Sequence, residues 1–163
     1  MTASPTPEDL QKRIRELEAK VESYQAQIGS LRESAEIYRL LIENSPDMIW
    51  IMSTESLKLH YLSPSIEQML GYTVEEALKK PFYEIITPES FEFAAQYFRE
   101  ETAKARREKT VANRIHKLEL EYLRKDGIPI WVEVTARPIF DENGHTKHII
   151  GVSRDISSRV AAQ

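Results

Sequence analysis

Apolar residues in the first quarter of the chain recur in alternating steps of four and three. One position of this seven-residue repeat holds Leu10, Leu17, Tyr24, Leu31 and Tyr38, and the other holds Ile14, Val21, Ile28, Ala35 and Ile42. Such a stripe, mainly β-branched at one position, is typical of two parallel helices in a coiled coil. The alternative is one amphipathic helix folded back on its own domain, although a stripe of roughly 50 Å exceeds what a small domain covers.

Capping chemistry predicts where this helix begins and ends. Thr6, Pro7 and the two carboxylates after them provide a hydroxyl cap, a first-turn proline and negative charge at the positive end of the helix dipole. At the other end, Pro46 pushes the residue before it out of the helical conformation. We therefore predict a flexible start and helix cap over residues 1–9 and a coiled-coil helix over residues 10–43.

After residue 47 the hydrophobic pattern predicts a globular unit. Residues 48–52 form a short apolar run typical of a buried strand, and residues 57–62 can pair with it as a hairpin. Short helices are predicted over residues 65–70, closed by Gly71, and over residues 73–79, opened by a capping box at Thr73.

A longer helix and three more strands complete the predicted fold. The helix runs from Pro88 to about Lys109, and we interpret the basic residues near its end as solvated. Residues 117–124 and 130–137 alternate between apolar and polar, and a last strand ends near Ile156. Two strands, several helices and three strands joined by hairpins predict an α+β domain with a five-stranded antiparallel sheet and helices on one face.

Composition and charge exclude several classes of function. The 163-residue chain is 41% hydrophobic, enough for one ordinary core, and its net charge of −4 gives no overall attraction for nucleic acid or anionic membranes. It has no long apolar run and no signal peptide, so we expect a cytoplasmic protein without membrane contact. It has no cysteine, no Gly-rich phosphate loop, no Gly-x-Ser-x-Gly motif and no histidine pair at metal spacing, so we expect no enzyme activity and no metal site.

Four short segments resemble the PAS domain family when they are taken together and in order. They are ENSPD (43–47), LGYTVEE (70–76), RKDG (124–127) followed by WVEV (131–134), and GVSRDIS (151–157). In that family the last strand often ends in Asp-Ile-Thr and passes into a coiled linker that drives a kinase, a cyclase or a transcription factor. The resemblance therefore implies a PAS domain over residues 44–156 and the start of an output helix over residues 157–163, with Ser157 as its cap.

The resemblance also implies a possible ligand, because some PAS domains hold a haem, a flavin or a small metabolite between sheet and helices. The light-sensing flavin subfamily needs a cysteine, which is absent, and its polar asparagine and glutamine positions correspond here to Val132 and Ser153. Haem-binding relatives take a histidine from or near the long helix, which has none, and we interpret all four histidines as exposed or hydrogen-bonded. We expect no haem and no cysteinyl flavin, whereas a small apolar ligand stays open.

If the register of the light-sensing relatives applies, eight residues face the central cavity. These candidate lining residues are Trp50, Met52, Tyr61, Leu120, Tyr122, Val132, Val134 and Ser153. The alternative, that Trp50 and its neighbours simply fill the core, stays open.

The opposite face of the sheet, with Trp131, Glu133, Ile150 and Val152, is expected to pack on the amino-terminal helix or on a second subunit. We therefore predict a homodimeric sensing and relay module of a signal-transduction protein. It is expected to detect a ligand or a mechanical input and to act on a downstream effector such as a histidine kinase in a two-component system. The alternative is a ligand-free PAS scaffold that only dimerises.

Overall fold

The first unit of the chain is a long helix. The computed structural model describes residues 4–108 and 114–163, and they divide into two units between Leu41 and Ile42. Helix α1 (Pro7–Glu43) has no buried residue. At its start the Thr6 hydroxyl accepts a hydrogen bond from the Asp9 amide at 3.1 Å, while the Asp9 carboxylate accepts one from the Thr6 amide at 3.0 Å. The predicted helix is confirmed, and its pairing with a second helix stays a prediction.

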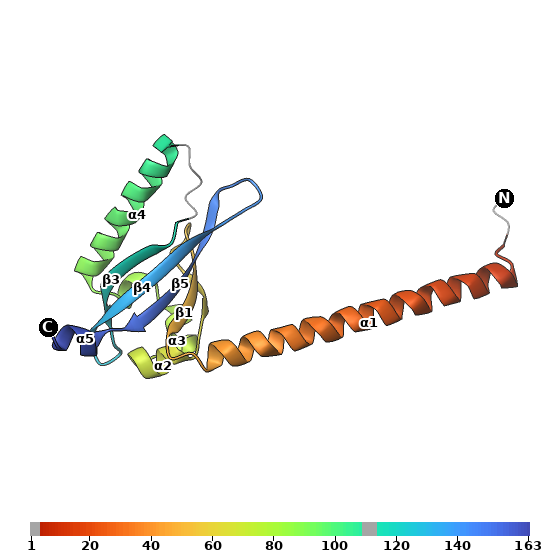
Figure 1. Cartoon of the computed structure of the whole chain (residues 1–163), viewed down its shortest axis with the longest axis horizontal. Helices are drawn as coiled ribbons and strands as arrows, with labels where there is room; N and C mark the ends of the chain where they lie inside the picture. Colours follow the sequence, from red (N-terminus) through yellow and green to blue (C-terminus); the bar gives the residue numbers. More distant parts are fainter. Residues whose placement is uncertain (1–3, 109–113) are drawn as a thin grey trace. The chain divides into compact units, whose positions relative to one another are not determined.

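The second unit is built on one antiparallel sheet with the strand order β2-β1-β5-β4-β3 (Figure 1). The strands are β1 (Met48–Ser53), β2 (Leu59–Leu62), β3 (His116–Leu123), β4 (Pro129–Phe140) and β5 (Thr146–Asp155). The strand last in sequence, β5, pairs with both β1 and β4 and so lies at the centre. The predicted five-stranded α+β fold is confirmed.

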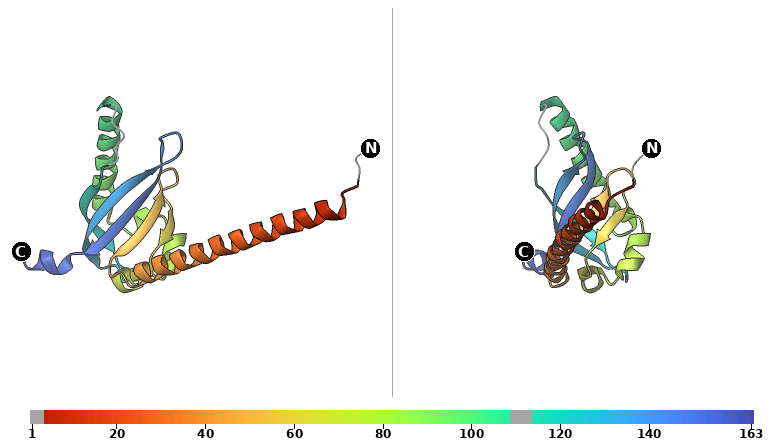
Figure 2. Two further views of the ribbon diagram at one scale, coloured as in Figure 1. Left: turned by 45° about the vertical axis from the view of Figure 1, so that its right-hand side comes forward. Right: turned by 90° about the vertical axis from the view of Figure 1, so that its right-hand side faces the viewer.

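Between β2 and β3 the described residues form four helical segments, and one short helix follows β5. They are α2 (Ser65–Leu70), α3 (Val74–Lys79), the 3-10 helix η1 (Phe82–Glu84), α4 (Pro88–Glu108) and α5 (Ser157–Ala161). Gly71 ends α2 with a left-handed φ of 81°, and Thr73 opens α3 with the predicted capping box. The predicted end of α4 near Lys109 lies outside the described residues. Figure 2 shows α5 continuing from the end of β5.

The core lies between the helices and one face of the sheet, which we call the inner face. Alternate residues of β3 and β4, including Leu120, Tyr122, Val132 and Val134, are buried there, as the sequence pattern predicted. Apolar residues of α2 and α3 pack into the same core. The outer face carries charged residues such as Glu119 and Arg154 together with half-buried apolar residues such as Trp131. None of the helices within the described ranges is long and apolar enough to cross a bilayer.

The hairpin between β1 and β2 departs from the regular pattern expected over residues 57–62. Leu57 has a φ of 54°, a left-handed conformation that a strand does not accommodate, so β2 starts only at Leu59. The pairing of β1 with β2 then shifts register between Ile51 and Met52, at a β-bulge. This irregularity changes which face the residues of β2 occupy.

Candidate functional site

A cleft of about 1070 Å³ lies between α4 and the inner face of the sheet. Most of its lining is apolar, with Phe82 and Phe98 on the helical side and Leu120 on β3. It extends to the β4–β5 hairpin, where Phe140 and His145 contribute to the wall. Because small-molecule sites in proteins are typically apolar clefts of roughly 300–1,000 Å³, this space has the size and character of a ligand site.

A chain of three buried polar groups lies at the deep side of the cleft. The Trp50 indole Nε1 donates a hydrogen bond to the Ser153 hydroxyl at 2.9 Å, and the Tyr122 hydroxyl lies 3.1 Å from the same oxygen. Burial raises the pKa of Tyr122 to about 12, against the opposing effect of its hydrogen bond with Ser153. The three groups are neutral near pH 7 and satisfy one another.

Gly151 makes this arrangement possible, because the Trp50 ring lies directly over it. The two residues are cross-strand partners on β1 and β5. A Cβ atom at position 151 would lie only 2.1 Å from Cζ2 of Trp50. The missing side chain therefore lets the indole lie flat on β5 and reach Ser153.

A second polar pair, buried His116 and half-buried Tyr97, lies where α4 faces β3, and His116 lines the cleft. His116 is 6% exposed, and its Nδ1 lies 3.1 Å from the Tyr97 hydroxyl. The rings of Tyr97 and Phe98 pack edge-on against its imidazole. Burial lowers the pKa of His116 and raises the pKa of Tyr97, so both groups favour the neutral state. Across residues 4–108 and 114–163, no three acidic or histidine side chains are grouped to hold a metal ion.

Seven of the eight candidate lining residues are buried on the inner face, and Tyr61 is not. Five of them border the cleft directly: Trp50, Met52, Leu120, Tyr122 and Val134. Val132 and Ser153 are fully buried beside it without lining it.

The placement of Tyr61 in the cavity is wrong. Tyr61 is 37% exposed and pairs with Ile51, a residue of the outer face, because of the β-bulge in this hairpin. A bulge of this kind shifts the side-chain alternation, so a simple count along the strand misassigns the residues beyond it.

The residues on the helical side of the cleft were absent from the predicted set. Phe82 of η1 makes aromatic contacts with both Trp50 and Tyr122. Phe91 and Phe98 line the cleft from α4. The apolar stripe of α4 was a usable signal for these two residues, whereas nothing local in the sequence brings Phe82 to Trp50.

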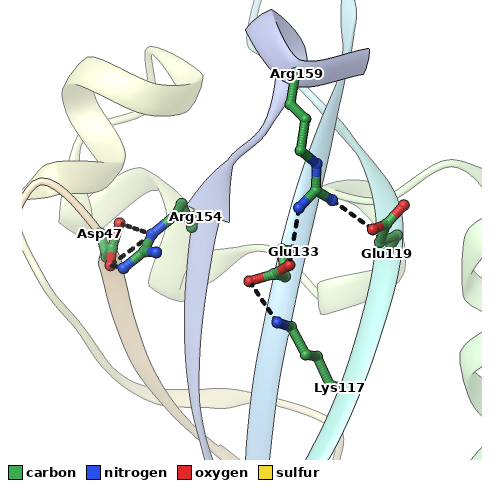
Figure 3. A network of polar contacts seen from close by, with 6 residues as sticks. All are labelled: Asp47, Lys117, Glu119, Glu133, Arg154 and Arg159. Carbon is green, nitrogen blue, oxygen red and sulfur yellow. Dashed lines mark hydrogen bonds and ion pairs between the residues drawn. The ribbon is translucent and has the colours of Figure 1, made fainter. Parts of the chain in front are cut away.

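The outer face carries ion pairs at the end of the sheet where β5 passes into α5 (Figure 3). Arg154 of β5 contacts Asp47, just before β1, at 2.8 Å. Arg159 of α5 contacts both Glu119 of β3 and Glu133 of β4. The two ion pairs of Arg159 connect α5 to β3 and β4, and the inner faces of these two strands border the cleft.

The start of α5 differs from the prediction. The Asp155 carboxylate accepts a hydrogen bond from the Ser157 amide at 2.8 Å, and Ile156 occupies the cap position. Ser157 is therefore the first helical residue, and its predicted role as the cap is wrong. Asp155 stabilises the helix start instead, because its side chain reaches the amide two residues on.

Comparison with known sequences and structures identifies the globular unit. The family profile described as the PAS domain matches residues 46–158. The crystal structure of the PAS domain of an HTR-like protein from Haloarcula marismortui superposes with a TM-score of 0.59 at 24% sequence identity, over 81% of this chain and 99% of that one.

Two curated relatives share part of their sequence with this chain. The methyl sulfide methyltransferase-associated sensor of Methanosarcina acetivorans is 30% identical over 134 residues, which are 82% of this chain and 12% of that protein. The bacterioopsin transcriptional activator of Halobacterium salinarum is 43% identical over 44 residues, 27% of this chain and 6% of that protein. The chain thus spans only a small part of either relative. Because the family profile covers well over half of its residues, the chain belongs to the PAS domain family and carries a PAS sensor domain.

Proposed function

We propose that this chain senses a small, largely apolar ligand and relays its presence through a dimeric helix to an effector. The observation that carries the proposal is the apolar cleft of about 1070 Å³, which borders β5 at Ile149. The same strand continues directly into α5. A ligand in this cleft would thus contact the strand that leads to the output helix.

The effector is proposed from the relatives. One of them is named a sensor and another a transcriptional activator, and similar PAS domains belong to histidine kinases. We propose a two-component histidine kinase or a transcription regulator as the effector, in the cytoplasm. In this proposal the module itself catalyses no reaction, and any enzyme activity belongs to the attached domain.

We propose a homodimer because two sets of apolar residues are exposed among the described residues. The repeat residues of α1 are exposed, Val21 for example by 52% and Ile28 by 48%. On the outer face of the sheet, Val152 is 36% exposed and Ile139 38% exposed. A second copy of α1 would bury the first stripe, and a second subunit or an amino-terminal helix would cover the other.

The proposed relay requires that the ligand favours one of two packings of the sheet and the dimer. A strong switch needs a difference of a few kcal/mol between the affinities for the two states. Because only Ile156 separates β5 from α5, a shift of β5 would change the angle or register of the output helix.

A second candidate is a ligand-free scaffold that dimerises and sets helix spacing. It is favoured by the buried polar chain, in which Trp50, Ser153 and Tyr122 satisfy one another without a ligand. The two candidates differ in whether the cleft is occupied in the cell.

Native mass spectrometry of protein purified from cells, together with an absorption spectrum, separates them. Sensing predicts a dimer that carries a bound small mass. Ala95 lines the cleft, so Ala95→Trp should obstruct it and reduce the fraction of protein that carries that mass, whereas Gln96→Trp on the exposed side of α4 should leave this fraction unchanged. A dimer without bound mass would support the scaffold, and a monomer would contradict both candidates.

A further inference from the structure

Two carboxylates face each other across neighbouring strands on the outer face. Glu119 of β3 and Glu133 of β4 are direct register partners. Like charges at opposed positions destabilise a sheet. The Glu133 side chain is only 14% exposed, so water screens it less than a fully exposed carboxylate. This acidic pair therefore favours a cation between its members.

Arg159 of α5 supplies such a cation. Its guanidinium donates one hydrogen bond to Glu119 and another to Glu133, the second at 3.3 Å (Figure 3). Lys117 contacts the other oxygen of Glu133 at 3.1 Å, and Arg154, the register partner of Glu133 on β5, is bound to Asp47. Among the described residues, Arg159 is the side chain that donates hydrogen bonds to both Glu119 and Glu133.

Two further hydrogen bonds hold the entry point of α5. The Ile156 amide donates to the Trp131 carbonyl at 2.9 Å, and the Asp155 carboxylate accepts a hydrogen bond from the Ser157 amide. The helix spans five residues, far too few for a helix to be stable in isolation. Contacts of its side chains with the sheet must therefore determine where it points.

We propose that Arg159 is the positioning residue of the output helix and that the Glu119–Glu133 pair is its socket. The inference rests on the proposed relay and gives it a mechanism. Glu119 lies between Leu118 and Leu120, and Glu133 directly precedes Val134, and all three apolar residues line the cleft. A ligand that changes the spacing of β3 and β4 on the inner face changes the spacing of the carboxylates on the outer face. A guanidinium is a rigid planar fork, so it fits one spacing better than another.

Amide hydrogen exchange of the full chain, measured by NMR, tests the positioning role. The Val160 amide donates to the Ile156 carbonyl within α5 and reports whether this turn is formed. In Arg159→Gln we expect its protection to fall roughly threefold to tenfold, while amides in the core strands stay unchanged. Arg154→Gln breaks a neighbouring outer-face ion pair and is the matched control, with Val160 protection retained.

A double-mutant cycle separates the socket from a general loss of charge. Glu119→Gln with Glu133→Gln should lower Val160 protection to a similar extent, and adding Arg159→Gln should then have little further effect. Unchanged protection in Arg159→Gln, additive effects, or an equal loss in Arg154→Gln would each overturn the proposal. Native mass spectrometry of the same proteins distinguishes a failure of the socket proposal from a failure of the proposed sensing function. If the purified chain carries no ligand but protection of its Val160 amide still depends on Arg159, the socket is supported and the sensing function is contradicted.

Discussion

The two faces of the sheet are built by the same strands on different physical principles. Along β5, Gly151 and Ser153 face inward and are buried, whereas Val152 and Arg154 face outward and are exposed. The inner face depends on close packing and on polar groups that water cannot reach, so each change there is costly. The outer face carries ion pairs near the protein surface, each worth about 1 kcal/mol, which in our proposal direct α5 more than they stabilise the fold. We therefore expect substitutions of inward-facing residues of β5 to change the stability of the fold, and substitutions of the outer-face residues that contact α5 to change the position of that helix.

Of the changes considered, Gly151→Ala should lower the free energy of unfolding most. The new Cβ would lie 2.1 Å from a ring atom of Trp50, so either the indole or β5 must move. We expect a loss of about 3 kcal/mol in the free energy of unfolding, measured by urea denaturation. Val152→Ala, one residue on and facing outward, is the control and should cost less than about 1 kcal/mol. Equal losses would show that the two faces are not distinct.

Ser153→Ala should have the next largest effect. It leaves the Trp50 indole and the Tyr122 hydroxyl buried without their shared partner. We expect a loss of about 2 kcal/mol in the free energy of unfolding, against less than about 1 kcal/mol for the outward-facing control Arg154→Gln. An unchanged midpoint of urea denaturation in Ser153→Ala would mean that this hydrogen-bonded chain does not stabilise the core.

Alkaline pH should give the smallest of the three effects. The folded protein holds the phenol proton of Tyr122 to a pKa of about 12, whereas an unfolded tyrosine loses it near pH 10. The stability due to the neutral phenol is therefore complete below pH 10 and is lost as the pH rises toward 12. Between pH 9 and 11 the wild type should lose about 1 kcal/mol more than Tyr122→Phe, measured by urea denaturation at each pH. Equal losses of stability in the wild type and in Tyr122→Phe would show that the Tyr122 phenol is not buried.

The sequence predicted the fold well because its signals are local and periodic. Alternation along residues 117–124 and 130–137 assigned the inner and outer faces of β3 and β4, and Thr73 and Gly71 marked helix ends. Family resemblance in four short segments agreed with this pattern and placed a PAS domain over residues 44–156, whereas the order of the strands within the sheet was not predicted. The same alternation failed for Tyr61, because a β-bulge shifts the register without a sign in the hydrophobic pattern.

The sequence predicted the sheet side of the candidate site but not the contacts between distant parts of the chain. The sheet side of the cleft was predicted from the register of the light-sensing relatives, and seven of the eight candidate lining residues are buried on the inner face. The contact of Phe82 with Trp50, the fit of Gly151 under the indole and the reach of Arg159 to Glu119 join residues far apart in the chain. Such contacts depend on how complete elements pack, so local propensity does not specify them.

By itself, the sequence determined a long helix with a seven-residue apolar repeat, an antiparallel α+β domain and the absence of cysteine chemistry. Only the tertiary structure decided that Asp155 rather than Ser157 stabilises the start of α5 and that two opposed glutamates receive Arg159. Periodicity and capping act within a few neighbouring residues, whereas the charge balance on a sheet face depends on side chains that meet only when distant strands pair.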